Sequence, residues 1–156
     1  MKELNCDIHI VGGALSGLLT AYCAAVLGYR IIISEKKNIL LNNKISITDT
    51  RTTAIAEGSK IFLESQGLWK FIKPFAEPIK NIKVMDTTAK CNLDFVNPIT
   101  KSNLGYIVKN SKLISVLIKE LQKRKNVNFL MGSSINSILF NKLNNISISN
   151  NKKINS

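Results

Sequence analysis

Apolar runs and a segment of helical periodicity alternate along the first part of the chain. Residues 6–11 form a short, β-branched apolar run, which predicts a strand buried in a parallel sheet. Beyond a glycine turn, apolar side chains recur at spacings of three and four over residues 15–27 and predict a helix that ends before Gly28. A second β-branched run, Ile31–Glu35, predicts the next strand. The order strand, helix, strand is typical of a βαβ unit and predicts an α/β fold.

The rest of the chain continues this pattern with shorter elements. Residues 36–48 are polar and rich in asparagine, which indicates a connection, and Asp49 after them is able to cap a helix start. Residues 59–66 predict a short helix closed by Gly67, and residues 111–123 predict a longer amphipathic helix. Strands are expected over residues 79–86, 93–96, 105–108 and 127–131, and a hairpin over residues 137–140 and 146–149, after which no further element is predicted.

The turn between the first strand and the first helix carries a dinucleotide-binding pattern. In such a turn the first glycine makes the bend, the second lets the backbone approach a pyrophosphate, and the third lets the helix pack on the strand. These positions are Gly12, Ala14 and Gly17, and Glu35 closes the second strand as the acid. A carboxylate there accepts hydrogen bonds from a ribose diol and repels a 2′-phosphate. The turn therefore favours FAD or NAD over NADP.

The same stretch allows a competing interpretation. Residues 8–29 contain no Asp, Glu, Lys or Arg, and this uncharged stretch is long enough for a membrane helix. Gly13 and Gly17 have the spacing of glycines in packed membrane helices. A signal peptide is also conceivable, although Glu3 and Asp7 are poor flanks for one. The strand-like run that follows at once favours the βαβ unit, because a single membrane helix has no need of it.

Composition narrows the classes of protein. The 156 residues are 45% hydrophobic, enough to bury one core, and the net charge of +12 suits an anionic partner. The lysines are scattered without interleaved aromatic residues, so we expect no nucleic-acid partner. Cys6, Cys23 and Cys91 form no CxxC pair, which argues against disulfides and a metal site and fits a reducing cytoplasm. His9, the only histidine, lies in an apolar run, which favours packing over Ser-His-Asp catalysis.

Four segments, taken in order, carry a resemblance to a known family. They are IVGGALSGLL followed by Glu35, then DTRTTAIAEGSKIFLESQGLW, AEPIKNIKVMD and GYIVKNSKLISVLIKEL. With them the chain resembles the N-terminal portion of the FAD-dependent aromatic hydroxylases of ubiquinone biosynthesis, the polyprenyl-methoxyphenol hydroxylase type. The resemblance implies a Rossmann-like FAD-binding domain with part of an inserted substrate-binding sheet. It also implies a monooxygenase in which flavin, reduced by NAD(P)H, activates dioxygen to hydroxylate an aromatic ring.

The resemblance assigns cofactor contacts to individual residues, and a catalytic role to none. It places Arg51 near the flavin side of FAD and Asn110 at the start of a helix beside the cofactor. A plain N-cap explains Asn110 equally well, because an apolar helical pattern follows it. The residues that it places at the pyrophosphate and ribose of the ADP part are Gly12, Gly13, Ala14, Gly17 and Glu35.

The resemblance also implies an organisation and a setting. Residues 1–77 and 108–156 would form an incomplete, discontinuous FAD-binding domain, and residues 78–107 would contribute strands to the substrate domain. The implied partners are a polyprenylated phenol as substrate, a membrane surface and other biosynthetic subunits. The implied location is the cytoplasm or the inner face of the membrane.

The chain departs from the family in two ways. Family members are longer and carry an Ala-Asp-Gly element and a later Gly-Asp segment that are not found in this sequence. We therefore expect the polypeptide alone to bind FAD weakly and not to turn over. In addition, Ala14 stands where the family has glycine, and its methyl group narrows the space for the pyrophosphate.

Two other functions compete with a monooxygenase fragment. One is a stand-alone nucleotide-binding or interaction module that another chain completes, and remnants of the missing elements in a neighbouring reading frame would distinguish the two. The other is an NAD-dependent dehydrogenase. The sequence argues against it, because it has no recognisable catalytic constellation of His, Lys or Tyr.

Overall fold

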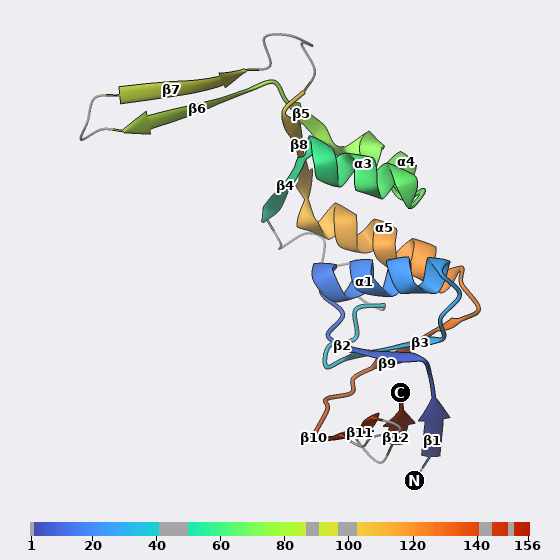
Figure 1. Ribbon diagram of the computed structural model, residues 1–156. Helices are drawn as coiled ribbons and strands as arrows, with labels where there is room; N and C mark the ends of the chain where they lie inside the picture. Colours follow the sequence, from blue (N-terminus) through green and yellow to red (C-terminus); the bar gives the residue numbers. More distant parts are fainter. Residues whose placement is uncertain (1, 41–49, 87–90, 97–102, 141–144, 150–151) are drawn as a thin grey trace. The chain divides into compact units, whose positions relative to one another are not determined.

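A computed structural model describes residues 2–40, 50–86, 91–96, 103–140, 145–149 and 152–156 (Figure 1). The chain divides into two compact units. The first consists of Met1–Asp49 with Leu113–Ser156, and the second of Thr50–Lys112. Residues 41–48 of the connection that was expected over residues 36–48, and the helix-capping Asp49, lie outside the described residues.

The first unit is built on the βαβ motif that the sequence predicts. Three parallel strands lie in the order β2-β3-β9, with Ile8 opposite Ile31 and Ile31 opposite Val127. The first four residues of the central strand, 31–34, are buried, as its β-branched composition indicates. Helix α1 contacts both β2 and β3. The bounds are β2 (Ile8–Val11), α1 (Leu15–Val26), β3 (Ile31–Glu35) and β9 (Val127–Met131).

A second sheet covers the other face of the parallel sheet, so that the parallel sheet lies between α1 and this layer (Figure 1). Its strands have the order β1-β12-β11-β10. A hydrophobic cluster joins the two sheets: Cys6, Ile32 and Ile154 are buried in it, and Leu4 and Leu130 pack against it. The bounds are β1 (Lys2–Asn5), β10 (Ser137–Phe140), β11 (Asn145–Ser149) and β12 (Lys152–Asn155).

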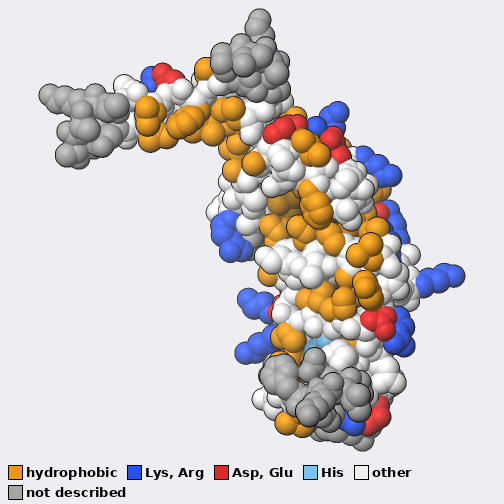
Figure 2. Space-filling view, in the orientation of Figure 1, with side chains coloured by type: hydrophobic (Ala, Val, Ile, Leu, Met, Phe, Trp, Pro, Cys, Tyr) orange, Lys and Arg blue, Asp and Glu red, His pale blue; other side chains and the backbone are white. Residues whose placement is uncertain are grey.

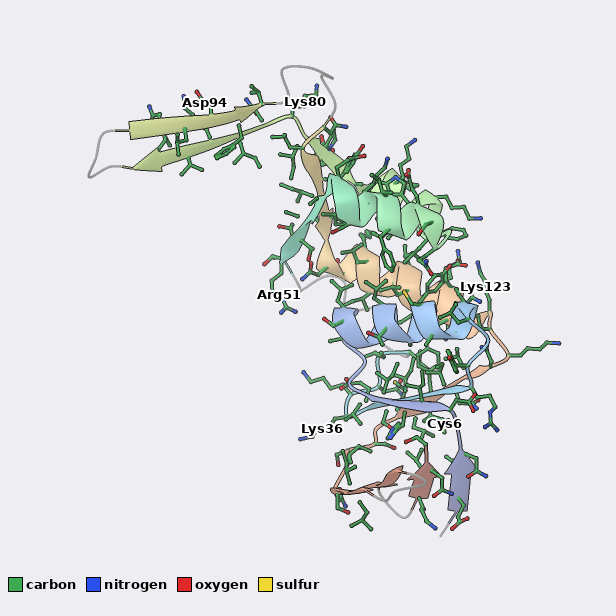
Figure 3. The ribbon with its side chains drawn as sticks, in the orientation of Figure 1. Cys6, Lys36, Arg51, Lys80, Asp94 and Lys123 are labelled. Carbon is green, nitrogen blue, oxygen red and sulfur yellow. The ribbon has the colours of Figure 1, made fainter. Side chains whose placement is uncertain are left out.

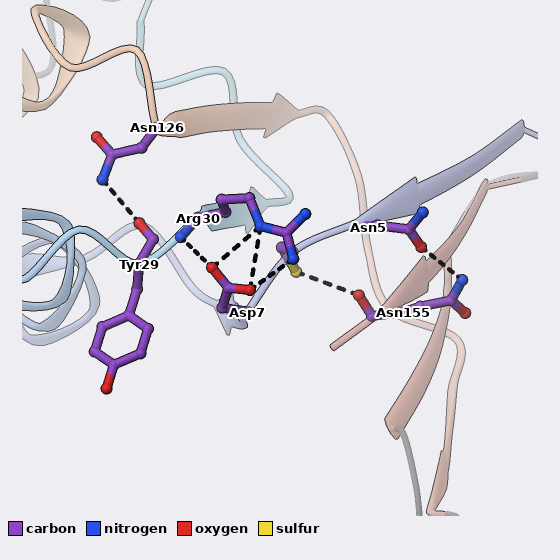
Figure 4. A network of polar contacts seen from close by, with 7 residues as sticks. Asn5, Asp7, Tyr29, Arg30, Asn126 and Asn155 are labelled. Carbon is purple, nitrogen blue, oxygen red and sulfur yellow. Dashed lines mark hydrogen bonds and ion pairs between the residues drawn. The ribbon is translucent and has the colours of Figure 1, made fainter.

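Two strands of this layer are absent from the sequence prediction. The hairpin of β10 and β11 was expected, whereas β1 and β12 were not. They pair in parallel, Lys2 opposite Lys152, and are joined by an Asn5–Asn155 side-chain hydrogen bond of 2.9 Å (Figure 4). Their short polar sequences have no apolar alternation, so the pairing across the length of the chain makes them strands.

Polar contacts tie the end of α1 to the parallel sheet (Figure 4). The carboxylate of Asp7 accepts a hydrogen bond of 2.6 Å from the backbone N–H of Arg30 and also pairs with the Arg30 guanidinium. These bonds lower the pKa of Asp7. The carboxamide of Asn126 donates to the carbonyl oxygens of Tyr29, at 2.8 Å, and Ala25, at 3.0 Å. The crossover from α1 to β3 is thereby held against the start of β9.

The second unit contains a three-stranded antiparallel sheet, in the order β4-β8-β5, and a separate hairpin of β6 and β7. Its core includes Trp69, whose ring lies 4.9 Å from that of Tyr106 in an edge arrangement. Helix α5 begins in this unit and continues into the first at Leu113. The bounds are β4 (Thr52–Ala56), α3 (Glu57–Ser65), α4 (Trp69–Ile72), η1 (Lys73–Phe75), β5 (Glu77–Ile79), β6 (Asn81–Asp86), β7 (Cys91–Val96), β8 (Gly105–Lys109) and α5 (Asn110–Gln122).

Strand β4 corrects the expectation for the segment after Asp49. The sequence suggested a helix start there, but residues 52–56 form a strand and the helix begins at Glu57. Ile55 is the only buried residue of this strand, and the threonines and alanines around it give no apolar alternation that would predict a strand. The segment is a strand because it pairs with β8. Strand β8 pairs with β4 and β5, not with the hairpin. The assignment of residues 78–107 to a substrate domain stays a prediction.

None of the helices in the described part of the chain combines the length and apolar composition needed to cross a membrane. Helix α1, in the stretch where the sequence left that alternative open, has 12 residues.

Candidate functional site

The bend between β2 and α1 depends on Gly12. Its φ of 110° lies in a region that side chains with a Cβ rarely adopt. The Gly12 N–H still belongs to the sheet, because it donates to the carbonyl oxygen of Ser34 at 2.8 Å. The chain thus leaves the sheet within one residue, as the first glycine of a dinucleotide turn requires.

Gly17 lets the helix approach the strand. A Cβ at this position would overlap the carbonyl oxygen of Gly12 and lie 3.3 Å from Cγ2 of Ile10. The backbone oxygen cannot move aside as a flexible side chain would. This close contact is the role expected of the third glycine, and it brings the start of α1 directly over the end of β2.

Glu35 is bound to the glycine turn. One carboxylate oxygen, Oε2, accepts a hydrogen bond of 2.7 Å from the Gly13 N–H, and Oε1 accepts one of 3.0 Å from the Lys37 N–H. The Lys37 bond is the largest cause that lowers the pKa of Glu35, and the Gly13 bond adds to it. A Cβ on Gly13 would lie 2.7 Å from Cδ1 of Ile39 and 3.1 Å from Cβ of Glu35, so a methyl group here would require the Ile39 side chain to shift. The carboxylate is therefore charged and held beside the turn.

The N-terminus of α1 has the features of an anion site. Ala14 is its N-cap residue, with φ −81° and ψ −178°, and provides no side-chain capping bond. Its carbonyl oxygen accepts the first helical bond, from the Leu18 N–H at 2.9 Å. The first turn contains no acidic residue. The backbone N–H groups and the positive end of the helix dipole are therefore available for a phosphate.

Arg51 and Asn110 come together in the second unit. The Asn110 N–H donates to the carbonyl oxygen of Arg51 at 3.0 Å, which extends the pairing of β4 and β8 by one step. The side chain of Asn110 accepts a hydrogen bond of 2.6 Å from the Thr53 hydroxyl. Arg51 is exposed just before β4 (Figure 3). The predicted cofactor residues thus form two groups, one in each unit: Gly12, Gly13, Ala14, Gly17 and Glu35 in the first, and Arg51 and Asn110 in the second.

Residues that the sequence reading did not single out support both groups. Ile39 packs near Gly13, and Thr53 bonds Asn110. The sequence shows only that they lie four residues after Glu35 and two residues after Arg51. This spacing does not by itself indicate a contact with Gly13 or Asn110. His9 is half-buried, as expected of a packing residue, and its Nε2 lies 2.8 Å from the Ser34 hydroxyl.

The geometry of the first group fits the ADP part of FAD. A helix start without a side-chain cap and a charged carboxylate at the end of the next strand are the groups with which a dinucleotide-binding turn holds a pyrophosphate and a ribose diol. No family model matches the chain. A solved structure of similar fold is the flavin-dependent monooxygenase PieE in complex with FAD and substrate, with a TM-score of 0.78 and 15% identity over 100% of this chain and 30% of that one. The fold is therefore that of part of a flavin-dependent monooxygenase.

Curated relatives identify a narrower resemblance. The chain is 29% identical over 117 residues to ubiquinone hydroxylase UbiL of Rhodospirillum rubrum, covering 74% of this chain and 27% of the relative. It is also 29% identical over 123 residues to the mitochondrial ubiquinone biosynthesis monooxygenase COQ6 of Danio rerio, covering 74% and 25%. The resemblance to FAD-dependent hydroxylases of ubiquinone biosynthesis is confirmed. The chain spans about a quarter of the length of these relatives.

Proposed function

We propose that this chain forms the ADP-binding part of the FAD site of a monooxygenase that hydroxylates a polyprenylated phenol in ubiquinone biosynthesis, with NAD(P)H as reductant. The observation that carries the proposal is the bond between the Gly13 N–H and Glu35. It holds a carboxylate beside a glycine turn and an uncapped helix start, which is the arrangement that binds the ribose and pyrophosphate of a dinucleotide.

Each residue of the turn has a defined task in this proposal. Gly12 and Gly17 let the backbone turn and α1 approach β2, so that the N–H groups of the first helical turn point to the pyrophosphate. Glu35 accepts hydrogen bonds from the ribose hydroxyls, and its charge disfavours a 2′-phosphate. Arg51 and Asn110 contribute donors to the flavin side of the cofactor. When bound, FAD supplies the oxygen chemistry, and the protein supplies position and electrostatics.

The proposal is tested by titrating the folded chain with FAD and with ADP. We expect saturable binding of one equivalent of each, followed by flavin fluorescence for FAD and by calorimetry for ADP. Affinity for FAD should be weak, and NAD(P)H should not be consumed by the chain alone. A folded chain that binds neither ligand would refute the proposal. Stoichiometric yellow flavin with NAD(P)H oxidation would instead refute the expectation of weak binding without turnover.

Peripheral association with an anionic membrane forms part of the proposal. The hairpin of β6 and β7 supports it, since four neighbouring apolar side chains on one face are each 44–56% exposed. The opposite face carries the Lys83–Asp94 pair, whose nearest atoms are 4.0 Å apart. Figure 2 shows the hydrophobic side chains along one side of this hairpin. The net charge of +12 would add attraction to anionic lipids. The apolar residues are Ile82, Val84, Leu93 and Phe95.

Co-sedimentation with vesicles tests this association. We expect binding to vesicles of phosphatidylcholine with phosphatidylglycerol, and less to phosphatidylcholine alone, because charge and apolar contact act together. Phe95→Ser should weaken binding, whereas Asn92→Ser, on the opposite face, should not. Equal binding by the two variants would contradict a role for this face. A hairpin that instead associates with another protein chain would favour the alternative of a module completed by a partner.

A further inference from the structure

Asn110 is held at two points by the segment 51–53. Its backbone N–H donates to the carbonyl oxygen of Arg51 at 3.0 Å, and its side-chain Oδ1 accepts from the Thr53 hydroxyl at 2.6 Å. Thr53 lies opposite Val108 in the pairing of β4 with β8, so its side chain starts two residues from Asn110 along the neighbouring strand. Both residues are partly buried.

The bond from Thr53 determines the orientation of the Asn110 carboxamide. An asparagine side chain carries an acceptor oxygen and a nitrogen with two donors, and rotation by half a turn about its last bond exchanges them. When Oδ1 accepts from the hydroxyl, Nδ2 is directed to the other side. A side chain tethered in this way loses less entropy when it binds a ligand than one that rotates freely.

We propose that Thr53 is a positioning residue of the FAD site: by donating to Oδ1 it presents the Nδ2 donors of Asn110 to acceptor atoms on the flavin side of the cofactor. This inference rests on the proposed function, in which Asn110 contacts FAD. Asn110 is the first residue of α5, and an N-cap role would use its side-chain oxygen for its own helix. Here that oxygen accepts from Thr53.

FAD titrations of five variants of the full chain test the proposal. Thr53→Val keeps the shape but removes the donor, and we expect FAD binding to weaken roughly 3- to 10-fold, as for the loss of one hydrogen bond. Thr53→Ser restores the hydroxyl and should restore affinity. Asn110→Ala should weaken binding, and adding Thr53→Val to it should have no further effect, because Thr53 acts through Asn110. Thr52→Val is the matched control on the same strand and should bind as the wild type does.

A merely structural role of Thr53 predicts a different pattern. Effects of Thr53→Val and Asn110→Ala that add, or a loss of affinity that Thr53→Ser does not restore, would overturn the proposal. So would unchanged affinity in Thr53→Val. Thermal denaturation of each variant shows whether a loss of affinity follows a loss of folding.

A nuclear magnetic resonance measurement separates this proposal from the proposed function. The two Nδ2 proton signals of Asn110 should have dispersed chemical shifts in the wild type and in Thr53→Ser. In Thr53→Val they should move towards the values of a freely rotating asparagine. Signals that do not change in Thr53→Val would show that the bond does not hold the carboxamide, and would overturn the inference. Absence of FAD binding by the wild type together with these shift changes would refute the proposed function and the role in FAD binding, while the hydrogen bond from Thr53 to the Asn110 carboxamide would stand.

Discussion

The backbone N–H of Gly13 donates a hydrogen bond of 2.7 Å to Oε2 of Glu35, residues 22 positions apart in the chain. The bond joins the turn after β2 to the end of β3. Since the neighbouring bond from Lys37 occupies the other oxygen, both carboxylate oxygens have fixed directions. Lone pairs that these two bonds do not use can accept from a ribose diol, so the carboxylate is oriented by the protein before a nucleotide arrives.

Replacing the charge of Glu35 should change nucleotide preference. Glu35→Gln keeps the size of the side chain and removes the negative charge. We expect affinity for ADP to fall by roughly tenfold, as for the loss of a charge-assisted hydrogen bond. Affinity for adenosine 2′,5′-bisphosphate should not fall, because repulsion of the 2′-phosphate is lost as well. Isothermal titration calorimetry with both ligands measures the ratio, and an unchanged ratio would contradict the assigned role of Glu35.

Removing the methyl group of Ala14 should tighten FAD binding. Ala14 is the N-cap residue of α1, and its side chain is exposed beside the helix start. Glycine there gives the pyrophosphate more room and is also a better N-cap residue than alanine. We expect Ala14→Gly to increase FAD affinity between about twofold and tenfold, with no loss of thermal stability. Weaker binding in Ala14→Gly would show that the methyl group does not obstruct the cofactor.

Adding a methyl group to Gly17 should have the opposite effect. The new Cβ overlaps the carbonyl oxygen of Gly12, so α1 must shift away from β2. We expect Gly17→Ala to lower the free energy of unfolding by roughly 1–3 kcal/mol and to weaken FAD and ADP binding. Gly58→Ala is the control, because a Cβ at Gly58 meets nothing within 4 Å. Chemical denaturation of both variants decides the matter: equal stabilities would mean that the close approach at Gly17 tolerates a methyl group.

His9 should make the stability of the fold depend on pH. Burial lowers its pKa below the ordinary 6.5, and its Nδ1 is buried without a hydrogen-bond partner among the described residues. The folded state therefore favours the neutral ring. The stability gained from this is fully present above pH 6.5 and is lost as the pH falls through the folded-state pKa, because the unfolded chain binds the proton more readily.

Thermal denaturation between pH 7.5 and 5.5 checks this expectation. The melting temperature should fall by several degrees as the pH decreases. The ordinary pKa values of Glu3, Asp7 and Glu35 are 4.5, 3.8 and 4.5, and the fold lowers each of them. These carboxylates therefore stay charged in that pH range. His9→Asn should have a flatter profile, and a wild-type profile as flat as that of the variant would exclude the histidine as the cause.

The sequence alone predicts the parts of the fold whose signal is local. The βαβ unit and α5 follow from apolar periodicity, and the bounds agree within a few residues: α1 was expected over residues 15–27 and is Leu15–Val26. The glycine spacing and the acid at Glu35 are likewise readable, because a sharp turn and a close helix approach restrict which residue types fit. The resemblance to ubiquinone hydroxylases rests on the same segments.

Tertiary structure decides the features that depend on pairing. Strands β1, β12 and β4 have weak local preferences and become strands through partners that are distant in the chain. The hydrogen bond of Thr53 to Asn110 spans 57 positions and no spacing rule predicts it. Even Glu35, whose identity the sequence supplies, owes its orientation to Gly13 across the sheet. Local chemistry determines which groups are present, whereas the direction of each group is set by contacts that form only when the chain folds.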